Sequence, residues 1–279
     1  MRKEYHVIAL DMDGTALNDK KEMGLRTKNA IHKALTVGKE VVFCTGRSYA
    51  EMEGILHEFP DMHYLCGESG ALLYDLKKNR PLKMLSVPER EISCIRETIT
   101  GRDIMPHFIS EGRSIVNSSQ LRRMEHYQMG VYQLAYLRTA MEVEDVFQMA
   151  EKEKCSVEKI NLFHTNPDER EKTRKALEQR HLSINMVYSE VSSLECTGQG
   201  VSKAIGLKAL CGELGISLDQ VIMVGDADND YEALKASGLA VAMGNANKRV
   251  KALCDVQVAD NNHDGCAQAI EKYLLGGVK

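Results

Sequence analysis

The first candidate for chemistry in the sequence is the run Asp11-Met12-Asp13-Gly14-Thr15, which directly follows the apolar residues 5–10. The apolar and β-branched side chains of that segment favour a buried strand. Two carboxylates at the end of a buried strand repel each other and are costly to bury. A divalent cation between them would remove much of that cost, because hard cations prefer carboxylate oxygens. The run therefore suggests a cation site at the end of a buried strand.

Three other interpretations of this run remain open at this point. Asp-Gly is an ordinary turn sequence, although a turn explains Asp13-Gly14 and not Asp11. A pair of exposed carboxylates can also belong to a solvated loop. Several oxygen-bearing residues match the spacing of a calcium loop, but Ala16 stands at the position that requires glycine, and the preceding segment favours a strand instead of a helix. The choice depends on the partners further along the chain.

The bulk composition excludes several classes of protein. The chain has 279 residues, with 43% hydrophobic and 27% charged residues and a net charge of -4. This length allows one large domain or two ordinary ones. The charge is too small and too evenly spread for a nucleic-acid surface. No run of about 18 apolar residues predicts a membrane span, and the N-terminus lacks the apolar core of a signal peptide.

The cysteines indicate the compartment. Eight cysteines are scattered along the chain without a Cys-x-x-Cys pair, and several, such as Cys44, Cys66 and Cys211, lie in apolar stretches. Free, mostly buried thiols in a reducing environment are the simplest interpretation. We therefore expect a cytoplasmic protein that binds neither nucleic acid nor a membrane. The oligomeric state is left open.

A second polar motif follows the next predicted strand. Residues 40–44 are built on Val-Val-Phe and run into Thr45-Gly46-Arg47-Ser48. Ser48 and Glu51 have the spacing of a capping box, so a helix should begin here. A hydroxyl and exposed backbone N–H groups at a strand-to-helix junction can hold an anion. The alternative is a plain capped turn.

A third motif lies near the C-terminus. The apolar residues 221–224 lead into Gly225-Asp226-Ala227-Asp228-Asn229-Asp230. Such acids are also common as helix caps, and as a calcium loop the run fails because Tyr231 stands at the glycine position. Because this run would face the Asp-x-Asp of residues 11–13 at the end of another strand, it favours magnesium. Magnesium needs few protein oxygens and keeps several waters. Lys203, at the start of a predicted helix, is the candidate counter-charge, although most lysines are simply solvated.

The order of predicted elements divides the chain. Strands and helices alternate at both ends, as in βαβ units of a parallel sheet. The middle mixes them without clean alternation, as in an α+β insertion. We therefore predict an α/β fold with a Rossmann-like parallel-sheet core at 1–84 and 198–279, and an inserted α+β cap domain at 85–197. Around Pro81 and Pro88, where the core gives way to the insertion, we expect a linker. Within the insertion we expect helices at 89–99, 141–154 and 167–180, and strands at 107–117, 159–164, 184–188 and 193–196.

The three motifs should converge, because ligands bind at the carboxyl ends of strands in an open α/β sheet. Asp11, Thr45 and Asp226 each come directly after a predicted strand. One carboxylate could then attack phosphorus to give an aspartyl-phosphate. A second carboxylic acid could protonate the leaving oxygen and later take a proton from water. Asp11 and Asp13 fit these two roles.

With these residues in place, the sequence resembles the haloacid dehalogenase-like (HAD) phosphatase superfamily, in particular its Cof-like branch with a large α/β (C2B-type) cap. Four motifs match in order from one end of the chain to the other. The first two are Asp11-Met12-Asp13-Gly14-Thr15 and Thr45-Gly46-Arg47. The third is Gly200-Val201-Ser202-Lys203, and the fourth is Gly225-Asp226 with Asn229-Asp230. The segments 241–246 and 264–265 also fit this branch.

The resemblance implies a magnesium-dependent phosphomonoesterase in which Asp11 is the nucleophile and Asp13 the acid/base. The implied phosphate-binding residues are Met12, Thr45, Gly46, Arg47, Lys203 and Asn229. The implied Mg2+ ligands are Asp11, the carbonyl of Asp13, and Asp226, with Asp230 in support. Four positions depart from the branch without removing a catalytic group, and these are Ser69, Ala204, Tyr231 and Ala233.

The predicted function is hydrolysis of a small phosphorylated metabolite, with a sugar phosphate favoured over a nucleotide or cofactor phosphate. A sugar phosphomutase is an alternative, and so is a catalytically silent binding or regulatory module. The silent module would be expected to lack at least one of Asp11, Asp13, Lys203 and Asp226, and all four are present. The cap is expected to set specificity. Its polar candidates are His107, Asn117, His164 and Glu195, each of which can equally be an ordinary surface or strand residue.

Overall fold

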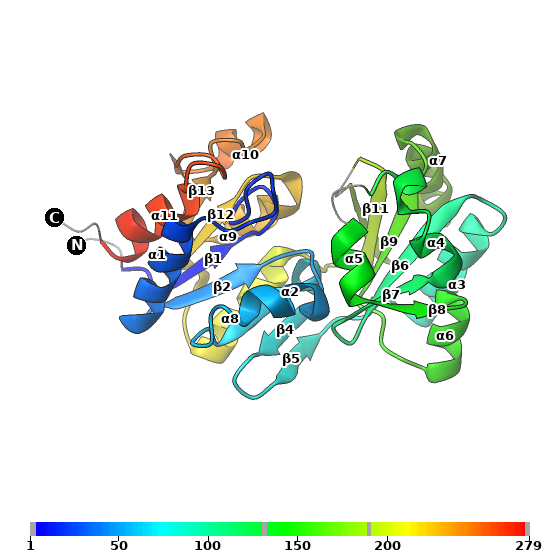
Figure 1. Cartoon of the computed structure of the whole chain (residues 1–279), viewed down its shortest axis with the longest axis horizontal. Helices are drawn as coiled ribbons and strands as arrows, with labels where there is room; N and C mark the ends of the chain where they lie inside the picture. Colours follow the sequence, from blue (N-terminus) through cyan, green and yellow to red (C-terminus); the bar gives the residue numbers. More distant parts are fainter. Residues whose placement is uncertain (1–3, 130–132, 189–190, 277–279) are drawn as a thin grey trace. The chain divides into compact units, whose positions relative to one another are not determined.

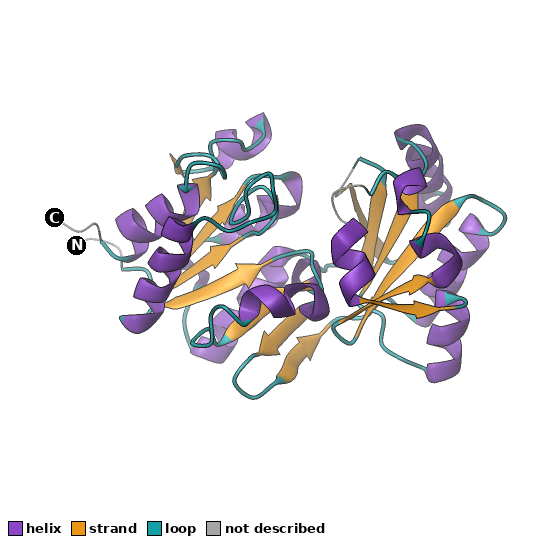
Figure 2. Cartoon of the chain, in the orientation of Figure 1, coloured by secondary structure: helices purple, strands orange, loops and turns teal. Residues whose placement is uncertain are grey.

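The computed structural model describes residues 4–129, 133–188 and 191–276. The contacts of the chain group it into two compact units (Figures 1 and 2). Unit 1 consists of the residues up to Gly46, Gly54–Lys83, and the residues from Ser202 onward. Unit 2 consists of Arg47–Glu53 and Met84–Val201. Both ends of the chain thus contribute to unit 1.

Unit 1 is built on a mainly parallel sheet. Its strand order is β14-β13-β12-β1-β2-β3-β4-β5. The pairs from β14 to β3 are parallel, whereas β3 and β4 are antiparallel. The strands are β1 (Val7–Leu10), β2 (Glu40–Cys44), β3 (Tyr64–Gly67), β4 (Leu72–Asp75), β5 (Arg80–Met84), β12 (Val221–Gly225), β13 (Leu239–Ala242) and β14 (Val256–Gln257). This is the predicted α/β class with a parallel sheet.

Helices cover both faces of this sheet. Helices α1 and α11 pack against each other, and α8 packs against α9 on the other face (Figure 1). All four residues of β1 are buried, as expected for a central strand that is covered on two sides. The helices of this unit are α1 (Leu25–Thr36), α8 (Lys203–Leu214), α9 (Tyr231–Ala236), α10 (Lys248–Leu253), and α11 (Gly265–Ala269), which continues as a π-helical turn over Ile270–Leu274. Helix α2 (Tyr49–Leu56) is divided between the two units, because its residues up to Glu53 belong to unit 2.

Short 3-10 turns complete unit 1, and the capping box at the start of α2 is confirmed. The turns are η1 (Glu68–Gly70), η4 (Leu218–Gln220) and η5 (Asp228–Asp230). The backbone N–H of Ser48 donates to the carboxylate of Glu51 at 2.7 Å, and the N–H of Glu51 donates to Ser48 Oγ at 3.3 Å. These bonds satisfy N–H groups that would otherwise have no partner at the helix start.

Unit 2 contains a second, mixed sheet with the strand order β10-β11-β9-β6-β7-β8. Its strands pair antiparallel except for β7 and β8, which are parallel. The strands are β6 (Ile104–Ser110), β7 (Arg113–Asn117), β8 (Ala140–Val143), β9 (Lys159–His164), β10 (Ile184–Tyr188) and β11 (Ser193–Gly198). This unit therefore has the α+β character that the sequence predicts for the middle of the chain.

Each face of the second sheet has its own apolar cluster. On one face Phe108, Ile160 and Leu194 pack against α3 (Glu89–Ile99), α6 (Val146–Glu153) and α7 (Pro167–Glu178). On the other face Met105 and Phe163 pack against residues of α4 (Ser118–Leu121), η2 (Met124–Tyr127) and α5 (Gln133–Thr139). Both faces also carry buried polar side chains, such as His164 and Thr173 on the first and His107 and Asn161 on the second.

Two expected elements of the middle segment are wrong. The helix expected at 141–154 is a strand, β8, followed by the shorter helix α6. Met141 and Val143 pack on the apolar cluster from a strand that pairs with β7, and Asp145 caps the helix by accepting N–H groups of Phe147 and Gln148. The linker expected around Pro81 is the strand β5, at the edge of the first sheet, where proline is tolerated because one side of an edge strand needs no partner.

The eight cysteines are free thiols in the structure, and five of them are buried. Among the described residues, no helix is both long enough and apolar enough to cross a bilayer.

Candidate active site

Three polar residues directly follow the carboxyl ends of the neighbouring strands β12, β1 and β2 in the first sheet. Leu10 is in register with Phe43 of β2 and with Val224 of β12, so the three strands end together. The N–H of Asp11 donates to the carbonyl of Val224 at 3.1 Å. Asp11, Thr45 and Asp226 follow these ends directly, which confirms the predicted convergence of the strands.

Lys203 is the centre of the site. Its Nζ lies 2.5 Å from Asp11 Oδ1 and 2.6 Å from Asp230 Oδ1, and its side chain is 1% exposed. Burial by itself disfavours the charged amine, but Asp11 and Asp230 outweigh burial and raise the pKa of Lys203 well above its usual range. Lys203 is therefore a fixed cation that bridges two carboxylates from different ends of the chain.

Close packing of α8 positions this lysine. A Cβ at Gly206 would lie 2.2 Å from the Sγ of Cys66, and a Cβ at Gly70 would lie 2.1 Å from the carbonyl oxygen of Ser202. Neither position has room for a side chain. The first turn of α8 can therefore approach β3 and η1 closely, which allows the Nζ of Lys203 to lie 2.5 Å from Asp11 Oδ1.

Asp230 organises the loop after β12. Its Oδ2 accepts the N–H groups of Asp226 and Ala227 at 3.0 and 3.1 Å, while its Oδ1 accepts from Lys203. Both oxygens of this fully buried carboxylate thus already have partners within the protein. Asp230 holds the loop and the lysine in position, and the glycine at 225 is needed because a Cβ there would lie 2.6 Å from Asp230 Cγ.

Asp226 is oriented by residues of the first motif. Thr15 Oγ1 donates to Asp226 Oδ1 at 2.8 Å. Gly14 has φ +81, and a Cβ there would lie 2.6 Å from Asp226 Oδ2, so glycine is required for both conformation and space. Asn245 Nδ2 donates to the carbonyl of Gly14 at 2.8 Å. Thr15 and Asn245 both lie in motifs of the sequence, but their hydrogen bonds are visible only in the structure.

Three carboxylates form a group that fits a divalent cation. Asp11, Asp226 and Asp230 each offer an oxygen, and these atoms all lie within 4.8 Å of one another. Burial and the charge of Asp230 raise the pKa of Asp11 well above its usual range. The same two causes raise the pKa of Asp226 to about 6. A hard cation would relieve this crowding of negative charge, so the donor set fits a cation such as Mg2+.

Asp13 differs from Asp11 in its surroundings. Its side chain is 27% exposed, against 7% for Asp11, and its Oδ1 lies 2.8 Å from the Nζ of Lys21. Asp13 is not part of the group of three carboxylates. The first motif therefore supplies one buried and one water-accessible carboxylate.

The turn after β3 holds the backbone of Thr45 from two directions. The N–H of Thr45 donates to Cys66 and its carbonyl accepts from the N–H of Ser69, both at 2.9 Å. Glu68 and Ser69 are buried and have φ of 55 and 59, the left-handed region that residues other than glycine seldom adopt. Such strain costs on the order of 1–3 kcal/mol per residue and often marks functional sites.

Three other predicted site residues, Met12, Gly46 and Asn229, are neighbours in the chain of Asp11, Thr45 and Asp230. Met12 is fully buried and its carbonyl accepts from the N–H of Leu17 at 2.9 Å. Gly46 follows Thr45, and Asn229 lies within η5 beside Asp230. Arg47 is grouped with unit 2.

Two of the polar candidates in the middle segment have structural partners. Asn117 Oδ1 accepts the N–H of Val146 at 2.8 Å. The imidazole of His164 lies between the carbonyl of Ser192 and the hydroxyl of Thr173, at 2.8 Å from each.

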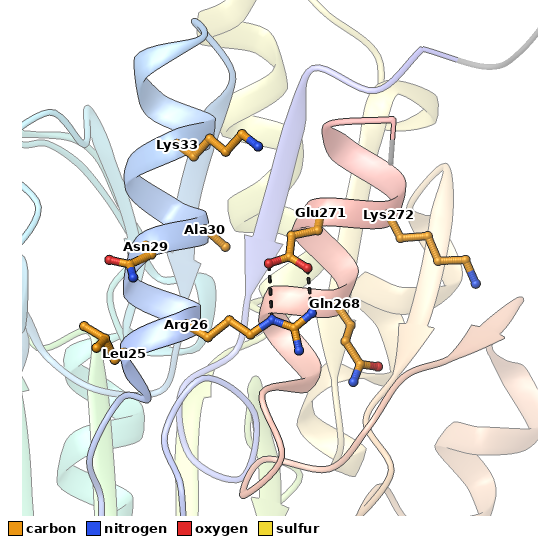
Figure 3. Close-up of a pocket in the computed structure, with 8 residues that line it drawn as sticks. All are labelled: Leu25, Arg26, Asn29, Ala30, Lys33, Gln268, Glu271 and Lys272. Atoms are coloured by element: carbon orange, nitrogen blue, oxygen red, sulfur yellow. Dashed lines mark hydrogen bonds and ion pairs between the residues drawn. The ribbon is translucent and has the colours of Figure 1, made fainter. Parts of the chain in front are cut away.

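A surface pocket lies apart from these residues. It is formed by α1 and the C-terminal helical segment, and the ion pair between Arg26 and Glu271, at 2.7 Å, crosses it (Figure 3). None of the predicted catalytic or metal-binding side chains lines this pocket. It does not contribute to the site described above.

Comparison with known proteins identifies the family. The model of the haloacid dehalogenase-like hydrolases matches residues 8–270. The chain therefore belongs to this family, and the resemblance to its Cof-like branch is confirmed.

Among curated relatives, the phosphatase YwpJ of Bacillus subtilis (strain 168) is 28% identical over 96% of this chain and 99% of its own length. The pyridoxal phosphate phosphatase YbhA of Escherichia coli (strain K12) is 27% identical over 96% of this chain and 98% of its own. Among solved structures, a haloacid dehalogenase-like hydrolase from Bacteroides thetaiotaomicron superposes with a TM-score of 0.84 at 24% identity. That match covers 96% of this chain and 99% of the other, and it shows that the two share a fold.

Proposed function

We propose that this protein is a magnesium-dependent phosphatase that hydrolyses a small phosphorylated metabolite through an aspartyl-phosphate intermediate. Its enzyme class is that of the phosphoric monoester hydrolases, as in its named relatives. The observation that carries the proposal is the ion pair of Lys203 with Asp11, at 2.5 Å, beside Asp226 and Asp230. A carboxylate beside a fixed cation and a cation site is suited to attack a negatively charged phosphoryl group.

In the first half-reaction Asp11 is the nucleophile. A carboxylate oxygen of Asp11 forms a bond to phosphorus while the bond from phosphorus to the ester oxygen breaks. Asp13 gives its proton to that leaving oxygen, so the product departs as an alcohol. Lys203 holds Asp11 in place and offsets the repulsion between two anions. Its pKa, raised by Asp11 and Asp230, keeps it positively charged.

In the second half-reaction Asp13 works in the opposite direction. It takes a proton from a water molecule, the water oxygen bonds to phosphorus, and the bond to Asp11 breaks to release inorganic phosphate. The exposure of Asp13, at 27%, allows it to exchange protons with solvent, which the 7% exposure of Asp11 does not favour. This difference supports the assignment of the two carboxylates.

The remaining residues bind the phosphoryl group and the cation. We assign phosphate binding to Met12, Thr45, Gly46, Arg47, Lys203 and Asn229. The side chains of Asp11 and Asp226 and the carbonyl of Asp13 would hold Mg2+, with Asp230 in support. When bound, Mg2+ supplies positive charge against the phosphoryl oxygens. The hydrogen bonds from Asp230 to the loop support a positioning role for this residue.

The substrate is proposed to be a sugar phosphate, or else a nucleotide or cofactor phosphate such as the one in the name of the relative YbhA. The division into a core at 1–84 and 198–279 and an inserted cap at 85–197 is likewise a proposal. We also propose a cytoplasmic location, which the free thiols support.

The test is hydrolysis of a panel of phosphorylated metabolites and 4-nitrophenyl phosphate, with Mg2+ and with EDTA. Wild type should turn over at least one ester only with Mg2+, and Asp11→Asn should abolish this turnover. Asp61→Asn changes an exposed aspartate outside the site, and it should behave like wild type. Turnover that survives Asp11→Asn would show that the nucleophile is assigned wrongly, and no turnover of any ester by wild type would refute the phosphatase function.

A further inference from the structure

A short loop after the first motif brings a lysine back to Asp13. The Nζ of Lys21 donates to Asp13 Oδ1 at 2.8 Å, and the two side chains are 29% and 27% exposed. Both residues belong to unit 1. An ion pair exposed to this degree adds little to the stability of a fold, because water screens the charges. Stability alone therefore gives little reason for a lysine at this position.

The backbone of Lys21 supports the same conclusion. Its φ is 62, in the left-handed region that residues other than glycine seldom adopt and that glycine reaches without strain. The turn is closed by Asn18, whose carbonyl accepts the N–H of Lys21 at 2.9 Å and whose Oδ1 accepts the N–H of Glu22 at 3.0 Å. None of these bonds uses the lysine side chain, so the turn would form equally with glycine in its place.

A second loop of unit 1 fixes the place of this turn. The carboxylate of Asp19 accepts from Asn261 Nδ2 at 3.1 Å and from Asn262 Nδ2 at 3.0 Å. Asn261 Nδ2 also donates to the carbonyl of Leu17 at 3.1 Å. The loop that carries Lys21 is thus tied to residues far away in the chain, and the lysine is held at a defined place beside Asp13.

The contact determines which oxygen of Asp13 can carry a proton. An ammonium group only donates hydrogen bonds, so the oxygen that faces Lys21 accepts from it and is not itself protonated. When Asp13 is an acid, its proton therefore lies on Oδ2. The carboxyl group of an aspartate otherwise rotates over a broad range of χ2. A general acid is effective only when its proton lies within hydrogen-bond reach of the leaving oxygen.

We propose that Lys21 is a positioning residue for proton transfer by Asp13. It holds Oδ1, so that Oδ2 presents its proton to the ester oxygen of the substrate. The proton moves to that oxygen while the bond from phosphorus to oxygen breaks, the product leaves as an alcohol, and Asp13 becomes a carboxylate paired with the ammonium. Lys21 acts through Asp13, and the inference rests on the proposed phosphatase function.

The experiment compares leaving groups that differ in their need for a proton. The alcohols of sorbitol 6-phosphate and pyridoxal phosphate are poor leaving groups without protonation, whereas the 4-nitrophenolate of the aryl ester departs as an anion. The quantity compared is kcat/KM with Mg2+, which reports the steps from free enzyme and substrate to the departure of the leaving group. Hydrolysis of the aspartyl-phosphate comes later and is the same for every ester.

Lys21→Met keeps the length of the side chain and removes its charge. It should lower kcat/KM about tenfold for the alkyl esters, a part of the 10²–10⁴-fold contribution typical of a general acid, and leave the aryl ester within about twofold of wild type. Lys21→Arg keeps a cationic donor and should restore most of the loss. Lys20→Met is the matched control, because Lys20 is the exposed lysine next to it in the chain, and it should behave like wild type.

Lys21→Gly separates the proposed role from folding. Glycine relieves the left-handed φ, so this variant should melt no lower than wild type and should still show the split between alkyl and aryl esters. Equal loss for both kinds of ester, loss for neither, or a gain for the alkyl esters would overturn the inference.

The behaviour of wild type distinguishes failure of this inference from failure of the proposed function. Hydrolysis of the aryl ester with no hydrolysis of any alkyl ester would overturn the inference, because no alcohol would then need the proton, while the phosphatase function would stand. Hydrolysis of no ester at all would refute the phosphatase function, and the role of Lys21 with it.

Discussion

Replacing Lys203 by methionine should strongly destabilise the metal-free protein. Lys203 is 1% exposed and contacts Asp11 and Asp230 at 2.5 and 2.6 Å. Methionine fills a similar volume but leaves two carboxylates without a counter-charge. Removing one partner of a buried ion pair costs about 3–5 kcal/mol. We therefore expect a loss of this size in the free energy of unfolding, measured by urea denaturation in EDTA.

Mg2+ should reduce this loss. A cation bound among the carboxylates offers a second source of positive charge, so Mg2+ should raise the stability of Lys203→Met more than that of wild type. The variant should still lose at least about 10²-fold in kcat, because the metal does not replace a fixed donor to the phosphoryl group. A stability change below about 1 kcal/mol in EDTA would refute the picture of a buried, mutually dependent charge cluster.

A double-mutant cycle tests the same reasoning without reference to activity. Asp230→Asn removes one carboxylate while it keeps an oxygen for the loop N–H groups. Combined with Lys203→Met, it should cost less than the sum of the two single changes, by about 1–3 kcal/mol. Additivity within about 0.5 kcal/mol would show that the two side chains are not energetically coupled.

Three further predictions address other parts of the molecule. Gly14→Ala forces a Cβ to 2.6 Å from Asp226 Oδ2 at φ +81. It should lower kcat and cost about 1–3 kcal/mol of stability, and wild-type values in both assays would contradict the packing described. His107 has a pKa lowered to about 3 against about 6.5 when unfolded, so its contribution to stability is full above pH 6.5 and is lost as the pH falls toward 3. The slope should reach about 1.4 kcal/mol per pH unit and should flatten in His107→Gln, as measured by urea denaturation at several pH values. An unchanged slope in that variant would mean that His107 is not the titrating group. Ser48→Ala removes half of the capping box with Glu51 and should lower stability by about 1 kcal/mol, whereas a thermal melt identical to wild type would show that the cap is unimportant.

The core strands and the converging motifs could be predicted from local patterns of apolar and polar residues. Residues 5–10, 40–44 and 221–224 are apolar runs that end in polar residues, and the structure has β1, β2 and β12 at these places. Local chemistry also identified the Ser48 and Glu51 capping box. These features depend on neighbours within a few residues, so they are visible in the chain itself.

Elements of the middle segment were harder to predict because their partners are distant. β8 is a strand because Ala140–Val143 pairs with β7, which lies well before it in the chain. β5 contains Pro81 and is exposed along most of its length, which resembles a linker until its place at the sheet edge is known. The segments α4, η2 and α5 are short helices that carry no clear periodicity, and their apolar side chains belong to a separate cluster.

The residue types and their order in the sequence were enough to indicate a phosphoryl-transfer site, because carboxylates and a hydroxyl after successive strands, together with a lysine, can bind both a divalent cation and a phosphoryl group. Only the tertiary structure decided how these groups share their charges. It placed Lys203 between Asp11 and Asp230, engaged both oxygens of Asp230, and aligned Asn161 with His107 and Glu195. These contacts join residues far apart in the chain, and they arise from strand register and helix packing, which spacing along a sequence does not encode.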